Sequence, residues 1–340
     1  MNFWEKLPKP FFVLAPMADV TDSAFRRMIA KYSAHKRADG TVGGPDVMWT
    51  EFVSADGLVR ATPEGREKLM ADLIYDETER PIVAQLFTSD EGHMEYSTAL
   101  CRELGFDGVD INMGCPDRSI EKQGCGSAMI KNPESAIRIV KAAKRGAKMG
   151  EKGGIPVSIK TRLGYNRDQL EEWLPLLLAE NPAVITVHGR TRKEMSKVPA
   201  RWERIGRAVE IRNEIQQGVK NQTLIIGNGD ALSLEDARRK AKLSGADGVM
   251  LGRAIFGNPW LFHPEKDIKN IPLEERLKVM VEHTELFVEL LPFKSLAIMK
   301  KHYKAYVKDF SGASELRAKL MEQESVVDIK AVVDDFLSTN

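Results

Sequence analysis

The chain has 340 residues, of which 43% are hydrophobic and 29% are charged. This composition excludes a disordered, collagen-like or coiled-coil protein and fits one large α/β domain with an appendage. The 50 lysines and arginines nearly balance the 49 acidic residues, so the overall charge gives no indication of a nucleic-acid partner.

Cysteine usage and hydropathy exclude further classes. The three cysteines, Cys101, Cys115 and Cys125, are odd in number and include no C-x-x-C spacing. Neither a disulfide framework nor a cysteine zinc site is therefore expected, and no metal site is predicted. The apolar runs are far shorter than the roughly 20 residues of a membrane span, and the first residues lack a signal-peptide pattern. We expect a cytoplasmic protein with no membrane partner, and no obligate protein partner is evident.

Short apolar runs recur eight times, and each is followed by a polar turn and a helical stretch. They span residues 11–17, 47–53, 81–87, 108–114, 155–164, 183–190, 223–230 and 248–255. Buried strands joined by helical crossovers form a parallel sheet, and eight of them close into a (β/α)8 TIM barrel. An open doubly wound sheet is the alternative.

Helix starts are marked between these runs. Thr88 with Glu91, and Ser233 with Asp236, have the spacing of a capping box. Asn132 suits an N-cap because a proline follows it at the first helical position.

The pattern becomes entirely helical after residue 262, over 272–291, 295–310, 313–323 and 326–337. We therefore predict a barrel domain over residues 1–262 and a small all-α domain over residues 263–340. Lys300, Lys304 and Lys308 recur every four residues and are predicted to share one helical face. Taken alone, they are most simply explained as a solvated face.

Polar or soft side chains come near the ends of the predicted strands. They are Met17, Glu51, Gln85, Asn112, Lys160, His188, Asn228 and Arg253. In a parallel barrel the carboxyl ends of the strands converge on one mouth, where the working groups lie. Each residue alone has a structural explanation, and a lone histidine such as His188 is often only a core hydrogen-bonder. Their joint occurrence indicates a polar ligand.

Glycines directly after the seventh and eighth predicted strands point to a phosphate site. Exposed backbone N–H groups are expected in IIGNGD and GVMLGRAIFG, where barrels commonly bind phosphate. The guanidinium of Arg253 adds a positively charged group that is able to donate two hydrogen bonds to a phosphate. Two ordinary strand-to-helix turns are the alternative. No G-x-G-x-x-G follows a strand and no P-loop occurs, so the barrel itself is expected to hold the phosphate-bearing group.

Cys115 lies between Gly114 and Pro116, just past the fourth predicted strand. A thiol with an ordinary pKa is mostly protonated at neutral pH, so Cys115 is a candidate general acid. A structural role is equally compatible with its position. Cys125, in the same glycine-rich loop, is the rival candidate, whereas Cys101 has the surroundings of a core helix residue.

Several of these segments, in the same order, resemble the tRNA-dihydrouridine synthases. The matching segments are LAPMADVTDSAFRRM, TEFVSADGL, AQLF, GFDGVDINMGCPDRSIEKQGCGSAMIKNP, SIKTRLG, TVHGRTR, IIGNGD and GADGVMLGRAIFGNPWLF. Further on, IMKKHYKAYVKDFSGASELRAKL resembles the family's RNA-binding helical domain. The resemblance runs from about residue 11 to 320, and INMGCP with the glycine loop is its most specific part.

The resemblance implies an FMN-bound barrel that reduces tRNA uridines to dihydrouridine with NADPH as electron donor. It assigns the cofactor-binding role to Pro16, Met17, Gln85, Lys160, His188, Asn228, Gly229, Asp230, Gly252 and Arg253. Asn112 would meet the flipped uracil, Arg162 would bind the substrate, and Cys115 would give its proton to C5 after hydride passes from flavin N5 to C6. Lys300, Lys304 and Lys308 would bind the tRNA.

Three segments depart from the family pattern as we expect it. Residues 33–46 are more extended, KVPARWERI replaces a shorter turn, and GCGSAM carries a second cysteine. These departures leave the target uridine open. Two other readings also stand: an FMN barrel that acts on a free pyrimidine or other small molecule, and a flavin-free barrel that serves as an RNA-binding or scaffold protein.

Overall fold

A computed structural model of the chain describes residues 2–37, 40–148 and 154–339. The chain divides into two compact units. The first contains Met1–Ala18 and Asp46–Gly252, and the second contains Asp19–Pro45 and Arg253–Asn340. The predicted domain boundary between residues 262 and 263 remains a prediction, because compactness alone does not show which segments fold independently.

The first unit is built on an eight-stranded parallel sheet. Its strands are β1 (Phe11–Leu14), β4 (Met48–Ser54), β5 (Ile82–Phe87), β6 (Gly108–Met113), β7 (Val157–Arg162), β8 (Val184–His188), β9 (Leu224–Asn228) and β10 (Gly248–Leu251). The order is β1-β10-β9-β8-β7-β6-β5-β4, and a parallel bridge between Val13 and Val47 joins the two ends. Each predicted run forms one strand, and the TIM barrel is confirmed.

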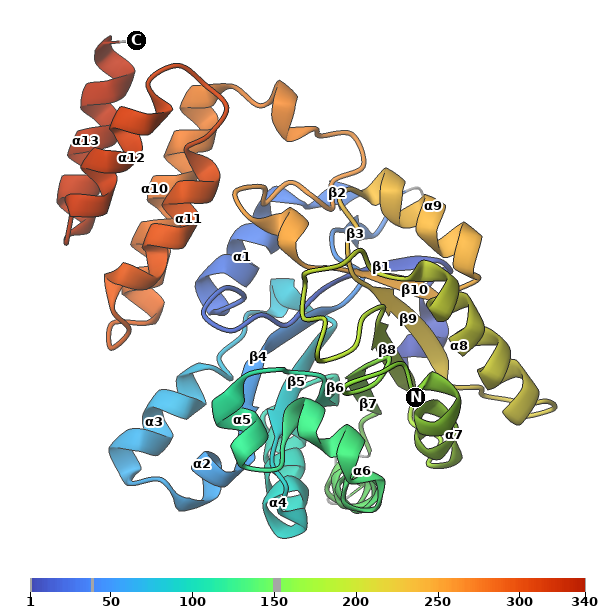
Figure 1. Cartoon of the computed structure of the whole chain (residues 1–340). Helices are drawn as coiled ribbons and strands as arrows, with labels where there is room; N and C mark the ends of the chain where they lie inside the picture. The colour runs from blue at the N-terminus through green and yellow to red at the C-terminus, as the bar shows by residue number, and fades with distance from the viewer. Residues whose placement is uncertain (1, 38–39, 149–153, 340) are drawn as a thin grey trace. The chain divides into compact units, whose positions relative to one another are not determined.

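Helices surround these strands (Figure 1). They are α2 (Ala55–Arg60), α3 (Pro63–Ala71), α4 (Glu91–Glu103), α5 (Arg118–Lys122), α6 (Pro133–Lys148), α7 (Leu170–Ala179), α8 (Trp202–Ile215) and α9 (Leu234–Ser244). Neighbours in this ring pack together, α4 on α6 and α8 on both α7 and α9. The sheet is therefore buried on its outer face, as the apolar strand sequences require.

Two of the three predicted helix starts are confirmed. The Ser233 hydroxyl accepts the N–H of Asp236 at 3.1 Å, and the Asn132 side chain accepts the N–H of Ser135 at 3.2 Å. The prediction for Thr88 is wrong, because α4 begins at Glu91 and Asp90 is its N-cap. The Thr88 hydroxyl instead accepts the N–H of Asp90 and so orients the residue that caps the helix.

The barrel interior changes from apolar to polar along the strands. The 3-10 helix η1 (Phe3–Lys6) places Trp4, 1% exposed, in a cluster with Trp49, Val184 and Ile226. Side chains on a strand alternate between its two faces, so the residues two positions beyond an inward-facing apolar residue also face inward. Ile226 is followed in this way by Asn228, and the polar side chains gather at the carboxyl ends.

The second unit is mainly helical, which confirms the predicted C-terminal helices. It contains α1 (Ser23–Tyr32), α10 (Leu273–Leu290), α11 (Lys300–Tyr306), α12 (Ala313–Glu322) and α13 (Val326–Thr339). α10 packs against α1, α11 and α13. Glu282 of α10 ties down the end of α1, because it accepts hydrogen bonds from Lys31 and from the Tyr32 hydroxyl, both at 2.6 Å. In the part of the chain that the structure describes, no helix is long and apolar enough to cross a membrane.

Within the segment 33–46, the second unit contains a short antiparallel pair of strands. β2 (His35–Lys36) pairs with β3 (Val42–Gly43), and Ala38 and Asp39 lie outside the described residues. A Cβ on Gly43 would lie 2.4 Å from the His35 ring, so a side chain at this position would displace that ring.

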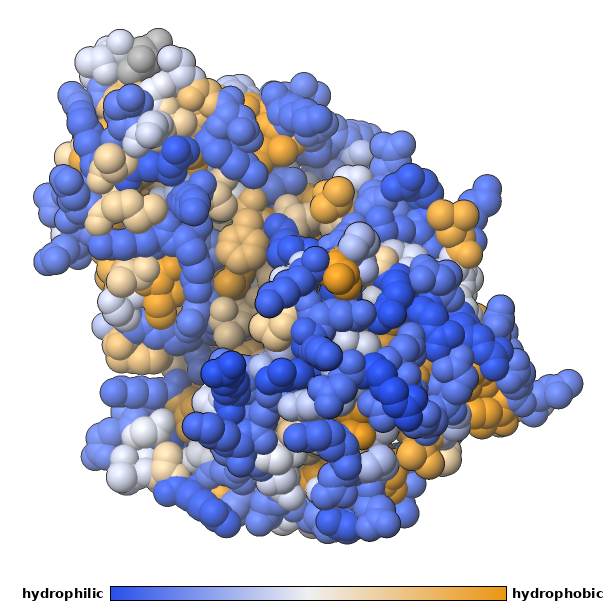
Figure 2. Space-filling model, viewed as in Figure 1, coloured by the Kyte–Doolittle hydropathy of each residue, from blue (hydrophilic) through white to orange (hydrophobic). Residues whose placement is uncertain are grey.

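The prediction that three lysines share one helical face is wrong. α11 ends at Tyr306, and Val307 leaves the helical conformation with ψ of 77°. Lys300 and Lys304 lie on α11, whereas Lys308 lies in the turn beyond it. Lys304 and Lys308 are exposed, and the face of the molecule in Figure 2 is largely hydrophilic.

Candidate active site at the carboxyl ends of the strands

The register of the barrel brings together the polar residues predicted at the strand ends. Lys160 is paired with Asn112 across β7 and β6, and Arg162 is paired with His188 across β7 and β8. His188 is in turn paired with Asn228 on β9. These residues therefore form a continuous polar arc at one end of the barrel.

The same end of the barrel holds the other predicted residues of the first unit. A Cβ on Gly252 would lie 3.5 Å from the sulfur of Met17, so the segment after β1 adjoins the end of β10. Pro16 and Met17 are both half-buried. Arg253 belongs to the second unit, where it begins the short helix η4 (Arg253–Ile255).

Lys160 is the central cation of the arc. Its ammonium group donates to the Asn228 side-chain oxygen at 3.3 Å, and the Asn228 amide nitrogen donates to the carbonyl of Met250. Burial, reinforced by the positive charge of Arg162, lowers the pKa of Lys160 to about 8. Lys160 thus remains mainly charged at neutral pH, and a negatively charged group placed beside it gains a strong electrostatic partner.

Cys115 lies on a turn that is held from both sides. Its backbone N–H donates to the Asn112 side-chain oxygen at 2.9 Å, and its carbonyl accepts both the backbone N–H and the hydroxyl of Ser127 at 2.9 Å. Gly126 has φ of +60°, and a Cβ there would lie 2.7 Å from the Cys115 carbonyl. Burial raises the pKa of the Cys115 thiol, so the group carries its proton at neutral pH.

The other two cysteines are less suited to chemistry. Cys125 is buried, its thiol donates to the carbonyl of Gln123 at 3.4 Å, and burial raises its pKa to about 11. Cys101 is buried within α4, where burial raises its pKa to about 12. Of the three, Cys115 alone is partly accessible.

Arg162 supports the same turn. Its Nε donates to the Gly114 carbonyl at 2.6 Å, and its Nη1 donates to the carbonyls of Thr191 and Met195. Burial lowers the pKa of Arg162 to about 10, which leaves the guanidinium charged. Arg162 was predicted to bind the substrate, which stays a prediction, and its hydrogen bonds show that it fixes the backbone beside Cys115.

A second network organises the turn after β9. Asp230 accepts hydrogen bonds from Arg190 and from the backbone N–H of Ala200. Gly229 has φ of +118°, and a Cβ there would lie 2.7 Å from the Ala200 Cβ. The segment KVPARWERI, which departs from the family pattern, is therefore the part of the chain that packs on this turn.

Arg190 also contacts His188, with 3.1 Å between its Nη1 and the His188 Nε2. A guanidinium only donates, so Nε2 accepts and the ring proton is placed on Nδ1.

Our sequence analysis missed Arg190 and the buried Asp110. The signal for Asp110 was present: it is a charged residue inside an apolar run, two positions before Asn112 and so on the same face of β6.

The groups present suit a flavin mononucleotide. Lys160 supplies a cation, and Gln85 and Asn228 supply amides. The hydroxyl of Thr186 is buried and has no hydrogen-bond partner among the described residues. Cations, amide donors and backbone exposed at glycines are the groups that bind a flavin ring and a phosphate.

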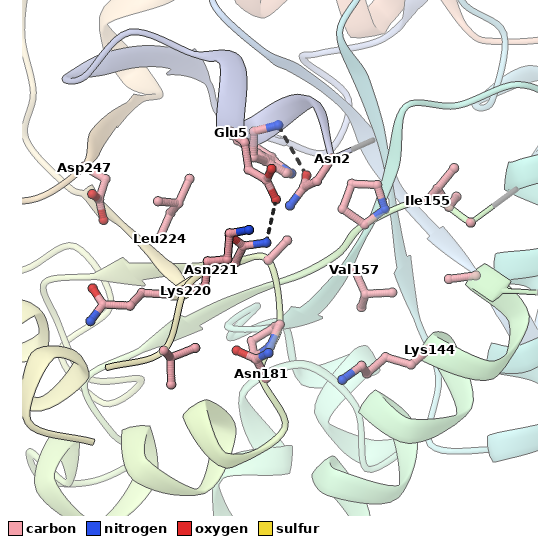
Figure 3. Close-up of a pocket in the computed structure, with 18 of the residues that line it drawn as sticks. Asn2, Glu5, Lys144, Ile155, Val157, Asn181, Lys220, Asn221, Leu224 and Asp247 are labelled. Carbon is pink, nitrogen blue, oxygen red and sulfur yellow. Dashed lines mark hydrogen bonds between the residues drawn. The ribbon is translucent and has the colours of Figure 1, made fainter. Parts of the chain in front are cut away.

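A separate cavity of about 710 Å³ lies at the opposite end of the strands (Figure 3). Its lining includes Val157 and Leu224, which begin β7 and β9, and Asp247, which precedes β10. Because barrel enzymes work at the carboxyl ends of their strands, this cavity is not the candidate site.

Comparison with known proteins agrees with the geometry. The model of the dihydrouridine synthase (Dus) family matches residues 13–340. The chain is 38% identical to a probable tRNA-dihydrouridine synthase 2 of Bacillus subtilis, over 98% of this chain and 96% of the relative. It is also 38% identical to a probable tRNA-dihydrouridine synthase of Staphylococcus aureus, over 98% and 95%.

Among solved structures, a histamine dehydrogenase from Rhizobium superposes with a TM-score of 0.47 at 13% identity. That match covers 81% of this chain and 48% of the dehydrogenase, and it is too distant to support a conclusion about function. The family model that matches residues 13–340 and the 38% identity to both relatives over 98% of this chain show that the chain belongs to the dihydrouridine synthase family.

Proposed function

We propose that this protein reduces uridines of tRNA to 5,6-dihydrouridine, with FMN as its bound cofactor and NADPH as its electron donor. The observation that carries the proposal is the protonated Cys115 thiol on a turn that Asn112, Arg162 and Ser127 hold at the carboxyl ends of the strands. Membership of the family supports it, because the two relatives named above are described as tRNA-dihydrouridine synthases.

The residues of the mouth have distinct tasks in this reaction. Bound FMN would supply the hydride that adds to C6 of the uracil. Cys115 donates its proton to C5, and Asn112 binds the base with the amide N–H that is not used inside the protein. Lys160 stabilises negative charge that develops at the mouth of the barrel, because it is a half-buried cation at the carboxyl ends of the strands.

Two groups of residues would hold the cofactor. Pro16, Met17 and Gln85 would line its ring, and Lys160 and His188 would contact its polar edge. Asn228, Gly229, Asp230, Gly252 and Arg253 would bind its ribityl chain and phosphate. With its proton on Nδ1, the His188 ring has a hydrogen-bond donor as well as the Nε2 acceptor.

The second unit supplies the affinity for tRNA. A base reaches a barrel mouth only after it leaves the stack, which costs a few kcal/mol, and contacts elsewhere on the RNA must offset this cost. Lys300 and Lys304 on α11, and Lys308 in the turn beyond it, would contact the phosphate backbone.

The first test compares Cys115→Ala with the matched variant Cys125→Ala in rapid-mixing experiments. Reduction of the flavin by NADPH is measured separately from its reoxidation by tRNA. Cys115→Ala is expected to abolish reoxidation by tRNA and to leave flavin reduction intact, because only the step at C5 uses the thiol. Cys125→Ala should retain most activity. Equal losses in both half-reactions would show that Cys115 is structural.

The second test identifies the substrate and the role of the lysines. We expect turnover of tRNA and none of free uridine. The slope of the logarithm of the tRNA-binding constant against the logarithm of the salt concentration measures how many phosphates are neutralised. Replacing Lys300, Lys304 and Lys308 with alanine should lower the magnitude of this slope by up to about three if each lysine neutralises one phosphate. An unchanged slope with unchanged affinity would show that these lysines only keep the surface solvated, and efficient reduction of free uridine would favour a small-molecule enzyme.

A further inference from the structure

A chain of side-chain hydrogen bonds runs through the barrel interior and ends at the Cys115 turn. The hydroxyl of Ser158 and the amide nitrogen of Gln85 each donate to Asp110 at 2.6 Å. The Asn112 amide nitrogen donates to the Gln85 side-chain oxygen at 3.2 Å. The Asn112 oxygen then accepts the backbone N–H of Cys115 at 2.9 Å. Asp110 is fully buried, so no bulk water replaces a link of this chain.

The register of the sheet makes these contacts possible. Asp110 on β6 is paired with Gln85 on β5 and with Ser158 on β7. Asn112 lies two residues further along β6, so its side chain projects on the same face as that of Asp110. The contacts therefore connect three adjacent strands, and no single strand is able to form them.

The groups at the two ends of this series of hydrogen bonds, the Cys115 N–H and the Asp110 carboxylate, determine how both amides are oriented. A backbone N–H can only donate, so the side chain of Asn112 must present its oxygen to Cys115. A carboxylate can only accept, so Gln85 must present its nitrogen to Asp110. With both ends determined, Asn112 and Gln85 have one arrangement that satisfies every bond between them. Each amide keeps one further N–H for a ligand.

We propose that Asp110 is a positioning residue for the reaction, acting through Gln85 and Asn112 on the turn that carries Cys115. The inference rests on the proposed function, in which Gln85 binds the cofactor and Asn112 binds the uracil. Asp110 itself touches neither. Its task is to keep both amides turned so that their free N–H groups serve the ligands and Cys115 stays in place.

The alternative is that Asp110 only fills space in the core, and the conservative variant separates the two possibilities. In Asp110→Asn the remaining oxygen still accepts from Gln85, provided that the new amide nitrogen finds an acceptor. Ser158 is able to be that acceptor if its hydroxyl rotates toward the Val109 carbonyl, which lies 3.4 Å away. In Asp110→Leu, which is close in size, no acceptor remains for Gln85.

The test measures uridine reduction, flavin reduction by NADPH and alkylation of Cys115 in the full-length flavin-bound protein. Asp110→Leu is expected to slow uridine reduction at least about tenfold and to speed alkylation of Cys115 by iodoacetamide several-fold, because the turn loses its support. Asp110→Asn should stay within about threefold of the wild type in both measurements. Equal behaviour of the two variants, whether both intact or both impaired, would overturn the inference.

A double variant decides the matter if Asp110→Leu does not fold. Ser158→Ala and Asp110→Asn should each have a small effect, because each keeps an acceptor for Gln85. Their combination leaves the new amide nitrogen without its acceptor, so the loss in uridine reduction should exceed the product of the single losses at least fivefold. Effects that simply multiply would overturn the inference.

Failure of the proposed function would have a different signature. If the wild-type protein held no flavin or did not reduce uridine in tRNA, the proposed function would be wrong. The alkylation rates of Cys115 would still test the role of Asp110, because they need neither flavin nor tRNA. Cys101 and Cys125, which are buried, report in the same experiment whether a variant has loosened the barrel as a whole.

Discussion

Replacing Lys160 with methionine should make the flavin-free barrel more stable at neutral pH while it impairs the reaction. The lowering of the Lys160 pKa from 10.5 to about 8 corresponds to about 3.4 kcal/mol of destabilisation of the folded state whenever the lysine is charged. The substitution also removes the hydrogen bond to Asn228, which contributes about 1 kcal/mol. The net expectation at pH 7 is a gain of about 2 kcal/mol in the free energy of unfolding.

The gain should depend on pH in a definite direction. The folded-state pKa lies below the unfolded-state value, so the full penalty applies below pH 8 and is relieved as the pH rises from 8 to 10.5. At pH 9.5 only about 1.4 kcal/mol of the penalty remains, which the lost hydrogen bond nearly cancels. Three groups influence this titration: Arg162 lowers the pKa, whereas Asp110 and Cys115 raise it.

Urea unfolding of the flavin-free protein between pH 7 and pH 9.5 measures this difference. The exposed Lys242 on α9 provides the control, and Lys242→Met should show no such dependence on pH. A Lys160→Met variant that is less stable than the wild type at pH 7, or whose advantage does not shrink as the pH rises, would refute the argument. Uridine reduction by the variant should fall at every pH, because the cation that stabilises developing charge has been lost.

Three further outcomes are expected. Arg253→Ala should weaken retention of FMN by about 1.5 to 3 kcal/mol, measured by flavin release and fluorescence titration, and release of FAD instead would show that the phosphate site is wrongly assigned. Gly126→Ala should cost about 1 to 3 kcal/mol in chemical unfolding and slow uridine reduction, because φ of +60° and the Cys115 carbonyl leave no room for a Cβ. Burial lowers the pKa of His302 to about 3 and that of His283 well below its usual range, so stability of the second unit should be lost as the pH falls below about 6.5. Replacing both histidines with phenylalanine should reduce this loss of stability at acid pH, measured by circular dichroism. An unchanged loss would show that other groups cause it.

Much of the barrel and of its mouth follows from local patterns in the sequence. Eight apolar runs predict eight strands because burial on both faces demands continuous apolar residues. The alternation of side chains along each strand predicts that Asn112, Lys160, His188 and Asn228 meet, because parallel strands end at one edge. Cys115 was predicted from its position just past a strand, and the structure adds the contacts that hold it.

Other features were decided by tertiary structure. The N-cap of α4 is Asp90 rather than Thr88, and α11 ends before Lys308, since both limits depend on how neighbouring residues cap and bury the chain. The links from Asp110 to Cys115 and from Arg190 to His188 join residues whose contacts depend on the register of the strands and on the path of a loop. Periodicity is a property of one segment, whereas a hydrogen bond between segments exists only when the closed sheet has placed donor and acceptor within about 3 Å of each other.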